Sequence, residues 1–182
     1  MRYRLCILLL LTLFVACNNT QRPERRPLAD TTFGKAYSTQ YGQHYLSRGV
    51  RQNVIDLDLY SENLSLDSLH HIVGTGTNLY LSDIFLPESE DTLLAETFVS
   101  DTTAAEYTFL PGVDYDSNIS GAYLLNITDG NLTSYTIFTE GSFIVNKEAD
   151  STHIHFTLKY TQGNVPLTYE ADFHGVIDYE KQ

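Results

Sequence analysis

Few side chains in this sequence combine the type and the spacing that catalysis or metal binding needs. The two cysteines, Cys6 and Cys17, both lie near the start of the chain, which excludes disulfides and thiolate ligands from the rest of it. The Gly-x-Ser-x-Gly motif of a serine nucleophile does not occur. His153 and His155 would share one face of a strand. His174 or the pair His70-His71 could complete a metal site with them, but sequence spacing does not place three such ligands together. We therefore predict no catalytic residue, no metal site and no cofactor.

The carboxylates do not single out a reactive group either. A glycosidase needs an acid held in apolar surroundings that raise its pKa, whereas Glu88, Glu90 and Asp91 gather in one polar loop. Asp114 to Asn118 starts like a calcium loop, but Ile119 and Leu125 replace the required glycine and glutamate. Glycan hydrolysis stays open as an alternative with no residue assigned to it.

Cys17 is the residue with the clearest chemical role. Arg2 and Arg4 precede an apolar run from Leu5 to Val15, the layout of a secretory signal that is too short to span a bilayer. The letters "FVAC" that end at Cys17 resemble a bacterial lipobox, with Phe14 in place of the usual Leu or Val. The resemblance implies a signal peptide over residues 1–16 and lipid (acyl chains such as palmitate) on Cys17, which would anchor the chain to a membrane.

The residues that follow Cys17 predict a tether and a location. Residues 17–35 are polar and contain two prolines, so we assign them to a flexible tether that precedes a single domain over 36–182. Lipoproteins exported to the cell surface in Bacteroidetes often carry an acidic cluster directly after the cysteine. Asn18 to Arg22 carry none. We therefore predict an outer-membrane anchor in the cell envelope, with the protein facing the periplasm.

A triplet of Asp, then Ser or Thr, then Thr or an apolar residue recurs along the chain. It resembles the O-glycosylation sequon of Bacteroidetes, which implies sugar on exported copies. The candidate acceptors are Thr31, Ser68, Thr92, Thr102 and Ser151. A chain rich in Asp, Ser and Thr also produces such triplets by chance.

Alternating apolar and polar residues predict an all-β domain. In Val54 to Tyr60, Ile55, Leu57 and Leu59 lie on one face and two aspartates on the other. Similar runs extend over residues 78–85, 122–127, 133–140, 142–146, 153–160 and 167–178. Asp129-Gly130 and Gly163-Asn164 separate neighbouring runs as hairpin turns. We predict an antiparallel β-sandwich, with a β-barrel as the alternative.

Charge limits the partners. The net charge of −12 repels phosphate backbones, so we predict no nucleic-acid partner. We predict that the lipid on Cys17 makes the membrane one partner, and we expect a second partner that is an envelope protein or a glycan. The tyrosines, 13 in number, could supply flat contact surfaces, but the filling of half-buried strand positions is the better explanation for most of them.

The second half of the chain resembles the small β-sandwich lipoproteins of Bacteroidetes. The segments "YTFLPG", "GAY", "EGSFIV", "HIHFTL" and "YEADFHGVIDY" fall between Tyr107 and Tyr179 in the order typical of those domains. Most of that family has no assigned activity, so the resemblance implies a fold and a location.

Three functional hypotheses follow. We favour a lipid-anchored, non-enzymatic accessory or binding module of the cell envelope, and keep an envelope glycan hydrolase and an adhesin or surface-assembly subunit as alternatives. Convergent carboxylates or histidines in a deep pocket would favour the enzyme. A tyrosine-lined face would favour binding, and a long unpaired strand edge would favour assembly.

Overall fold

The computed structural model describes residue 28 and residues 31–69, 71–116 and 118–182. Cys17, the signal segment and most of residues 17–35 lie outside this part, and the first strand begins at Thr31. In chain order the elements are β1 (Thr31–Gly42), the 3₁₀ turn η1 (Leu46–Arg48), β2 (Asn53–Ser61), β3 (Leu64–Leu66), β4 (Ile72–Gly74), β5 (Gly76–Leu86), β6 (Thr97–Ser100), β7 (Thr108–Phe109), β8 (Val113–Tyr115), β9 (Asn118–Ser120), β10 (Ala122–Thr128), β11 (Asn131–Ile137), β12 (Glu140–Lys147), β13 (Thr152–Gln162), β14 (Val165–Gly175) and β15 (Ile177–Lys181).

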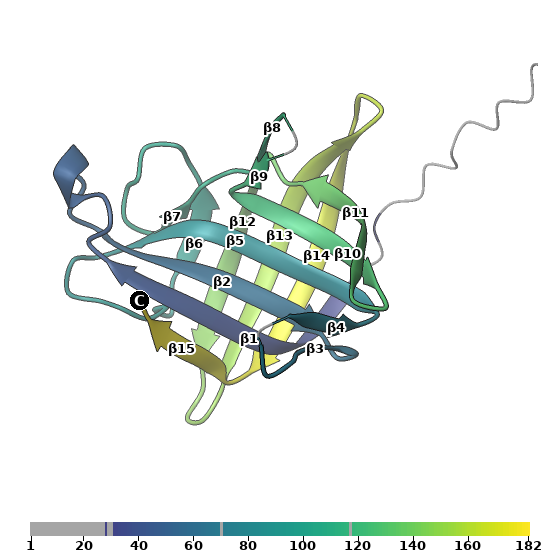
Figure 1. Cartoon of the computed structure of the whole chain (residues 1–182). Helices are drawn as coiled ribbons and strands as arrows, with labels where there is room; N and C mark the ends of the chain where they lie inside the picture. The colour runs from purple at the N-terminus through teal and green to yellow at the C-terminus, as the bar shows by residue number, and fades with distance from the viewer. Residues whose placement is uncertain (1–27, 29–30, 70, 117) are drawn as a thin grey trace, which may run out of the picture.

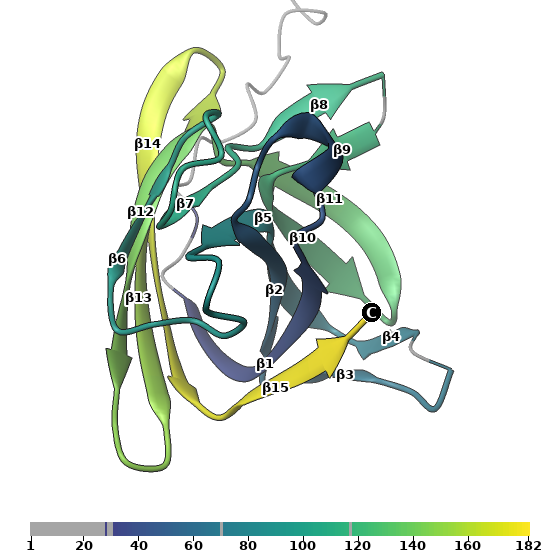
Figure 2. The ribbon, with the colours of Figure 1, turned by 90° about the vertical axis from the view of Figure 1, so that its left-hand side faces the viewer.

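The main sheet closes on itself (Figures 1 and 2). Eight strands follow one another around the ring in the order β5, β2, β1, β14, β13, β12, β6 and β7, and β7 pairs back onto β5. The all-β prediction is thus confirmed. The two separate sheets of a sandwich are not shown, because the described strands of both sides belong to one continuous hydrogen-bonded sheet. Closure removes edges that an open sheet would leave unpaired.

Two strands of the ring change partner along their length. The first part of β5 pairs with β10, and its last residues pair with β7. Likewise, β1 runs parallel to β14 at its start and parallel to β15 from Ala36 onward. A strand that changes partner must bend, and irregular pairing interrupts the register of β2 with β5 and of β1 with β2. These bends let β10, β11 and β15 extend outside the ring.

Local turn chemistry agrees with the predicted hairpins. Asp129 and Gly130 join β10 to β11 with φ of 50° and 75°, and Gly163 and Asn164 join β13 to β14 with φ of 55° and 70°. Positive φ at both central residues defines the type I′ turn, whose twist matches that of the strands. The prediction of one strand over 167–178 was wrong in one respect: β14 ends at Gly175, and β15 leaves to pair with β1. The predicted strand over 133–140 also extends too far: β11 ends at Ile137, and Glu140 is the first residue of β12.

Aromatic side chains fill the interior of the ring. Phe98 and Phe143 stack with ring centroids 4.6 Å apart, and Phe109 and Phe156 pack against Phe143 at 5.4 and 5.5 Å. Buried aliphatic residues such as Leu57 complete the same cluster. A barrel of eight strands is just wide enough for side chains to fill it. The residues of this interior are therefore used for packing.

A second, small apolar cluster lies on the outer face of the sheet. The β3–β4 hairpin packs there through Leu64, which is buried against Tyr60 and Ile127. Leu66 and Tyr37 cover the side of this cluster. Within the described part of the chain, no helix has the length and apolar character needed to cross a membrane.

Candidate functional site

The outer face of β1, β2 and β5 carries a band of tyrosines and aspartates. Alternation places Ile55, Leu57 and Leu59 inward, where they are buried, and directs Asp56 and Asp58 outward. Asp56 and Asp58 are neighbours on one face of the same strand, yet their surroundings give them different roles.

Asp56 stabilises the bend in β5. Its Oδ1 accepts a hydrogen bond from the Asp83 N–H (2.9 Å), and its Oδ2 accepts hydrogen bonds from the hydroxyls of Tyr80 and Tyr41 (3.2 Å for Tyr41). Asp83 has a φ of 51° and lies where β5 passes from β10 to β7. Three donors compensate for the burial of this carboxylate, which is 8% exposed. We assign Asp56 a structural role at the point where the barrel closes.

Asp58 is mostly buried and much less well compensated. Its Oδ1 accepts hydrogen bonds from the Asn78 amide (3.2 Å) and from the Tyr60 hydroxyl at the long distance of 3.5 Å. Burial raises the pKa of Asp58 from 3.8 to about 6, the hydrogen bond from Asn78 opposes this rise, and the charge of Asp56 adds to it. Oδ2 makes no hydrogen bond to any described residue, so it is available to a ligand.

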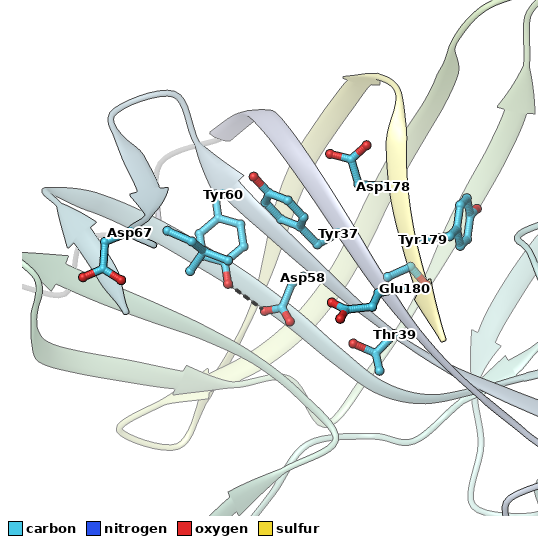
Figure 3. Close-up of a pocket in the computed structure, with 10 residues that line it drawn as sticks. Tyr37, Thr39, Asp58, Tyr60, Asp67, Asp178, Tyr179 and Glu180 are labelled. Carbon is cyan, nitrogen blue, oxygen red and sulfur yellow. Dashed lines mark hydrogen bonds between the residues drawn. The ribbon is translucent and has the colours of Figure 1, made fainter. Parts of the chain in front are cut away.

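A pocket of about 420 Å³ opens beside Asp58 (Figure 3). Tyr37 and Tyr60 form an edge-to-face pair with ring centroids 5.7 Å apart, and Asp58 lies next to them on β2. Two further elements complete the pocket. The end of the β3 segment contributes Leu66 and Asp67, and β15 contributes Asp178 and Glu180. Figure 3 shows Tyr179 turned away from this group, and its hydroxyl accepts a hydrogen bond from the Leu93 N–H at 3.2 Å.

The pocket is acidic. Asp58, Asp67, Asp178 and Glu180 line it, and none of its described lining residues is Lys, Arg or His. Two lysines on β1 and β15 make other interactions: Lys35 donates to the Leu64 carbonyl at 2.6 Å, and Lys181 pairs with Asp91 at 3.0 Å. Asp67 pairs with His71 at 3.4 Å, and its pKa is lowered by hydrogen bonds from the backbone N–H groups of His71 and Leu69. The carboxylates of Asp58, Asp178 and Glu180 have no basic partner among the described residues.

A smaller hollow of about 240 Å³ lies at the other end of the tyrosine and aspartate band. Tyr41, His44, Tyr45 and Asp83 line it. The Tyr45 hydroxyl donates to Asp83 Oδ1 at 2.7 Å, and burial raises the pKa of Tyr45 to about 12. Its polar groups bond mainly to each other, so we regard this hollow as part of the support for β5.

The predicted outward position of His153 and His155 is confirmed, since Ile154, Phe156 and Leu158 between and beyond them are buried. His155 lies between two carboxylates: Nδ1 is 2.9 Å from Asp172 and Nε2 is 3.1 Å from Glu170. The hydrogen bond to Asp172 raises the pKa of His155. Burial opposes the shift at Asp172, but the hydrogen bonds from His155 and His153 hold the pKa of Asp172 below 3.8. Among the described residues, no group of three His, Cys, Asp or Glu side chains is arranged to hold a metal ion.

The five predicted glycosylation positions fall in different surroundings. Ser68 and Thr102 are exposed in turns, whereas Thr31, Thr92 and Ser151 are half-buried. The Ser151 hydroxyl also lies 3.1 Å from both Glu148 Oε2 and His174 Nε2. In two triplets the aspartate binds the backbone two residues on: Asp67 accepts from the Leu69 N–H and Asp101 from the Thr103 N–H. These triplets therefore also form Asx turns, and their glycosylation stays a prediction.

Comparison with family models, with curated proteins and with solved structures gave no match. The resemblance to small lipoproteins therefore stays a prediction, and the residues of the pocket carry the functional argument.

Sequence reasoning missed Asp58. The alternating segment Asp56 to Tyr60 showed an outward acidic row, but acidic residues on a strand face usually contact water. Asp58 accepts a hydrogen bond from Asn78 on β5 and lines one pocket with Tyr37 from β1 and Asp67 from the end of the β3 segment, and no local pattern brings these residues together.

Proposed function

We propose that this protein is a lipid-anchored, non-enzymatic binding module of the cell envelope that holds its ligand in the outer pocket beside Asp58. The predicted lipid on Cys17 supports the anchor, and the absence of acidic residues from Asn18 to Arg22 supports an outer-membrane attachment that faces the periplasm. The ligand comes from the envelope, either a protein or a glycan.

The pocket is the observation that supports a binding role. Aromatic side chains fill the barrel interior, so a ligand surface is expected on the outside. There, the half-buried ring of Tyr37 lies against the buried Tyr60 and beside Asp58, a carboxylate whose burial the fold compensates only in part. Ionisable groups with such perturbed pKa values gather at functional sites.

The anchor is tested by substitution of each cysteine in the full chain, expressed in a Gram-negative host. Cys17→Ala should abolish precursor cleavage and move the protein out of the membrane fraction. Cys6→Ala, which alters the part removed with the signal peptide, should leave partitioning and intact mass unchanged. Equal partitioning of both variants would rule out lipidation at Cys17.

The binding role is tested by co-purification from envelope membranes. The wild-type protein should retain an envelope component that Asp58→Asn loses and that Glu106→Gln keeps. Glu106 is exposed in the segment between β6 and β7, so its substitution removes one negative charge away from the pocket. Loss of the same component from both variants, or from neither, would contradict a role for the pocket.

One observation favours the glycan hydrolase as a second candidate. A carboxyl group with a pKa of about 6 keeps a proton close to neutral pH, as a general acid requires. Asp178 and Glu180 line the same pocket and are the candidates for its partner. Release of reducing sugar from envelope glycan by the wild-type protein, and its loss in Asp58→Asn, would replace the binding proposal with this one.

A further inference from the structure

We infer that the pocket beside Asp58 binds an organic cation of the alkylammonium type, the group found on polyamines and on lysine side chains. This inference rests on the proposal that the pocket is the ligand site of a binding module, and it names the chemical class of that ligand.

The negative charge of the pocket excludes most other chemical classes of ligand. Four carboxylates line it and no described basic residue does, so an anionic ligand such as a phosphate or a carboxylate would be repelled. A bare metal ion needs several ligands on one centre, and no such group of three is found among the described residues. A cation with an organic stem fits both limits.

The walls of the pocket match the two parts of such a ligand. Tyr37 meets the buried Tyr60 edge to face and remains half-buried itself, and an aromatic ring attracts an ammonium group to its face. Leu66 packs, like Tyr37, against the outer cluster that contains Tyr60, and it offers an apolar contact for the methylene stem. At about 420 Å³ the pocket has room for a linear amine and its hydration water.

Asp58 supplies the directional contact. Both hydrogen bonds that it accepts from described residues reach Oδ1, which leaves Oδ2 free to accept from an ammonium group. The exposed carboxylates of Asp178 and Glu180 on β15 line the same pocket and add a negative potential that attracts the same ligand. The Tyr37 hydroxyl makes no hydrogen bond to a described residue, so the ring of Tyr37 can adjust to a ligand without breaking one.

The experiment is calorimetric titration of the lipidated full-length protein in detergent micelles. The probes are spermidine and the peptide Ala-Lys-Ala, which distinguish a free polyamine from a lysine side chain, with n-butylammonium as the minimal group. The controls are n-butanol and N-acetylglucosamine. We expect the amines to bind with one-to-one stoichiometry, n-butanol to give no heat of binding, and the affinity to fall as salt is added.

Four variants locate the site. Asp58→Asn should weaken amine binding by about 10- to 100-fold, the effect of losing one charged hydrogen-bond acceptor. Glu106→Gln changes the net charge equally and should bind like the wild type. Tyr37→Phe should retain affinity because it keeps the ring, whereas Tyr37→Leu should lose it. Circular dichroism and thermal unfolding confirm that each variant is folded.

Three results would overturn the inference. If no amine binds, the pocket is not a site for an organic cation. If Asp58→Asn and Glu106→Gln weaken binding equally, the attraction comes from the general negative charge of the protein. If N-acetylglucosamine binds in a manner that depends on Asp58 and the amines do not, the pocket is a sugar site. In this last case the binding module stands and only the cationic ligand is refuted.

Discussion

Replacement of Asp58 by asparagine should stabilise the protein, and by an amount that depends on pH. Burial raises the pKa of this carboxyl from 3.8 to about 6, so the folded protein binds the proton more tightly than the unfolded chain does. Between these two values the folded state holds more protons than the unfolded state, and the free energy of unfolding therefore falls as pH rises. The destabilisation is complete above the folded pKa and absent below the unfolded one.

The magnitude follows from the shift. About two pKa units correspond to about 3 kcal/mol between pH 4 and pH 7. Asparagine has the same shape and remains uncharged, and its oxygen can still accept from Asn78 and Tyr60. The variant should thus be more stable than the wild type by up to about 3 kcal/mol at pH 7, with the two proteins nearly equal at pH 3.5.

Asp56→Asn is the matched comparison on the same strand. It removes an acceptor that three donors contact, so we expect it to destabilise the protein by about 1.5–3 kcal/mol at neutral pH. The assay is urea unfolding, followed by circular dichroism, at half-unit steps from pH 3.5 to 8. The ionisable side chains that line the pocket with Asp58 or interact with its charge must be considered in this pH series, and they are Tyr37, Tyr41, Asp56, Tyr60, Asp67, Tyr80, Tyr123, Asp178 and Glu180.

Burial raises the pKa of both Tyr41 and Tyr123 to about 12, so neither of these two tyrosines titrates in this range. A stability difference between Asp58→Asn and wild type that is constant with pH would refute the reasoning. So would a variant that is less stable at pH 7. The expected result has a functional meaning: a carboxylate that weakens the fold while it strengthens ligand binding is a group kept for function.

Three further outcomes can be checked separately. The His155 imidazole should titrate above 6.5, and Asp172→Asn should lower its pKa, as measured by NMR; the stability from this pair is present below pH 6.5 and is lost as pH rises through the raised pKa. Ser38→Ala should raise the free energy of unfolding by about 1 kcal/mol, because the buried Ser38 hydroxyl has no hydrogen-bond partner among described residues; a clear loss in urea unfolding would reveal a partner. Phe143→Ala should cost about 3–5 kcal/mol in the same assay, because Phe143 stacks on Phe98 in the core; a cost below 1 kcal/mol would mean that the interior is loosely packed.

Much of the secondary structure could be predicted because its causes are local. Alternation in Val54 to Tyr60 reflects one face toward the core, and Asp129-Gly130 adopts the positive φ values that its turn requires. The end of β14 was harder, since β15 continues the alternation and differs only in its partner. A change of partner is a long-range event that leaves no periodic signal in the chain.

The sequence by itself determined most of the long strands, their buried faces and two of the hairpin turns, because side-chain alternation and turn conformation depend on near neighbours. It also supports the prediction of a lipid on Cys17. The closed ring and the pocket were decided only by tertiary structure. The bend at Asp83 turns β5 from β10 to β7, and the separation of β15 from β14 brings Glu180 beside Thr39. The mostly buried and only partly compensated carboxylate of Asp58 also depends on contacts between distant segments, since desolvation depends on what surrounds a group in space.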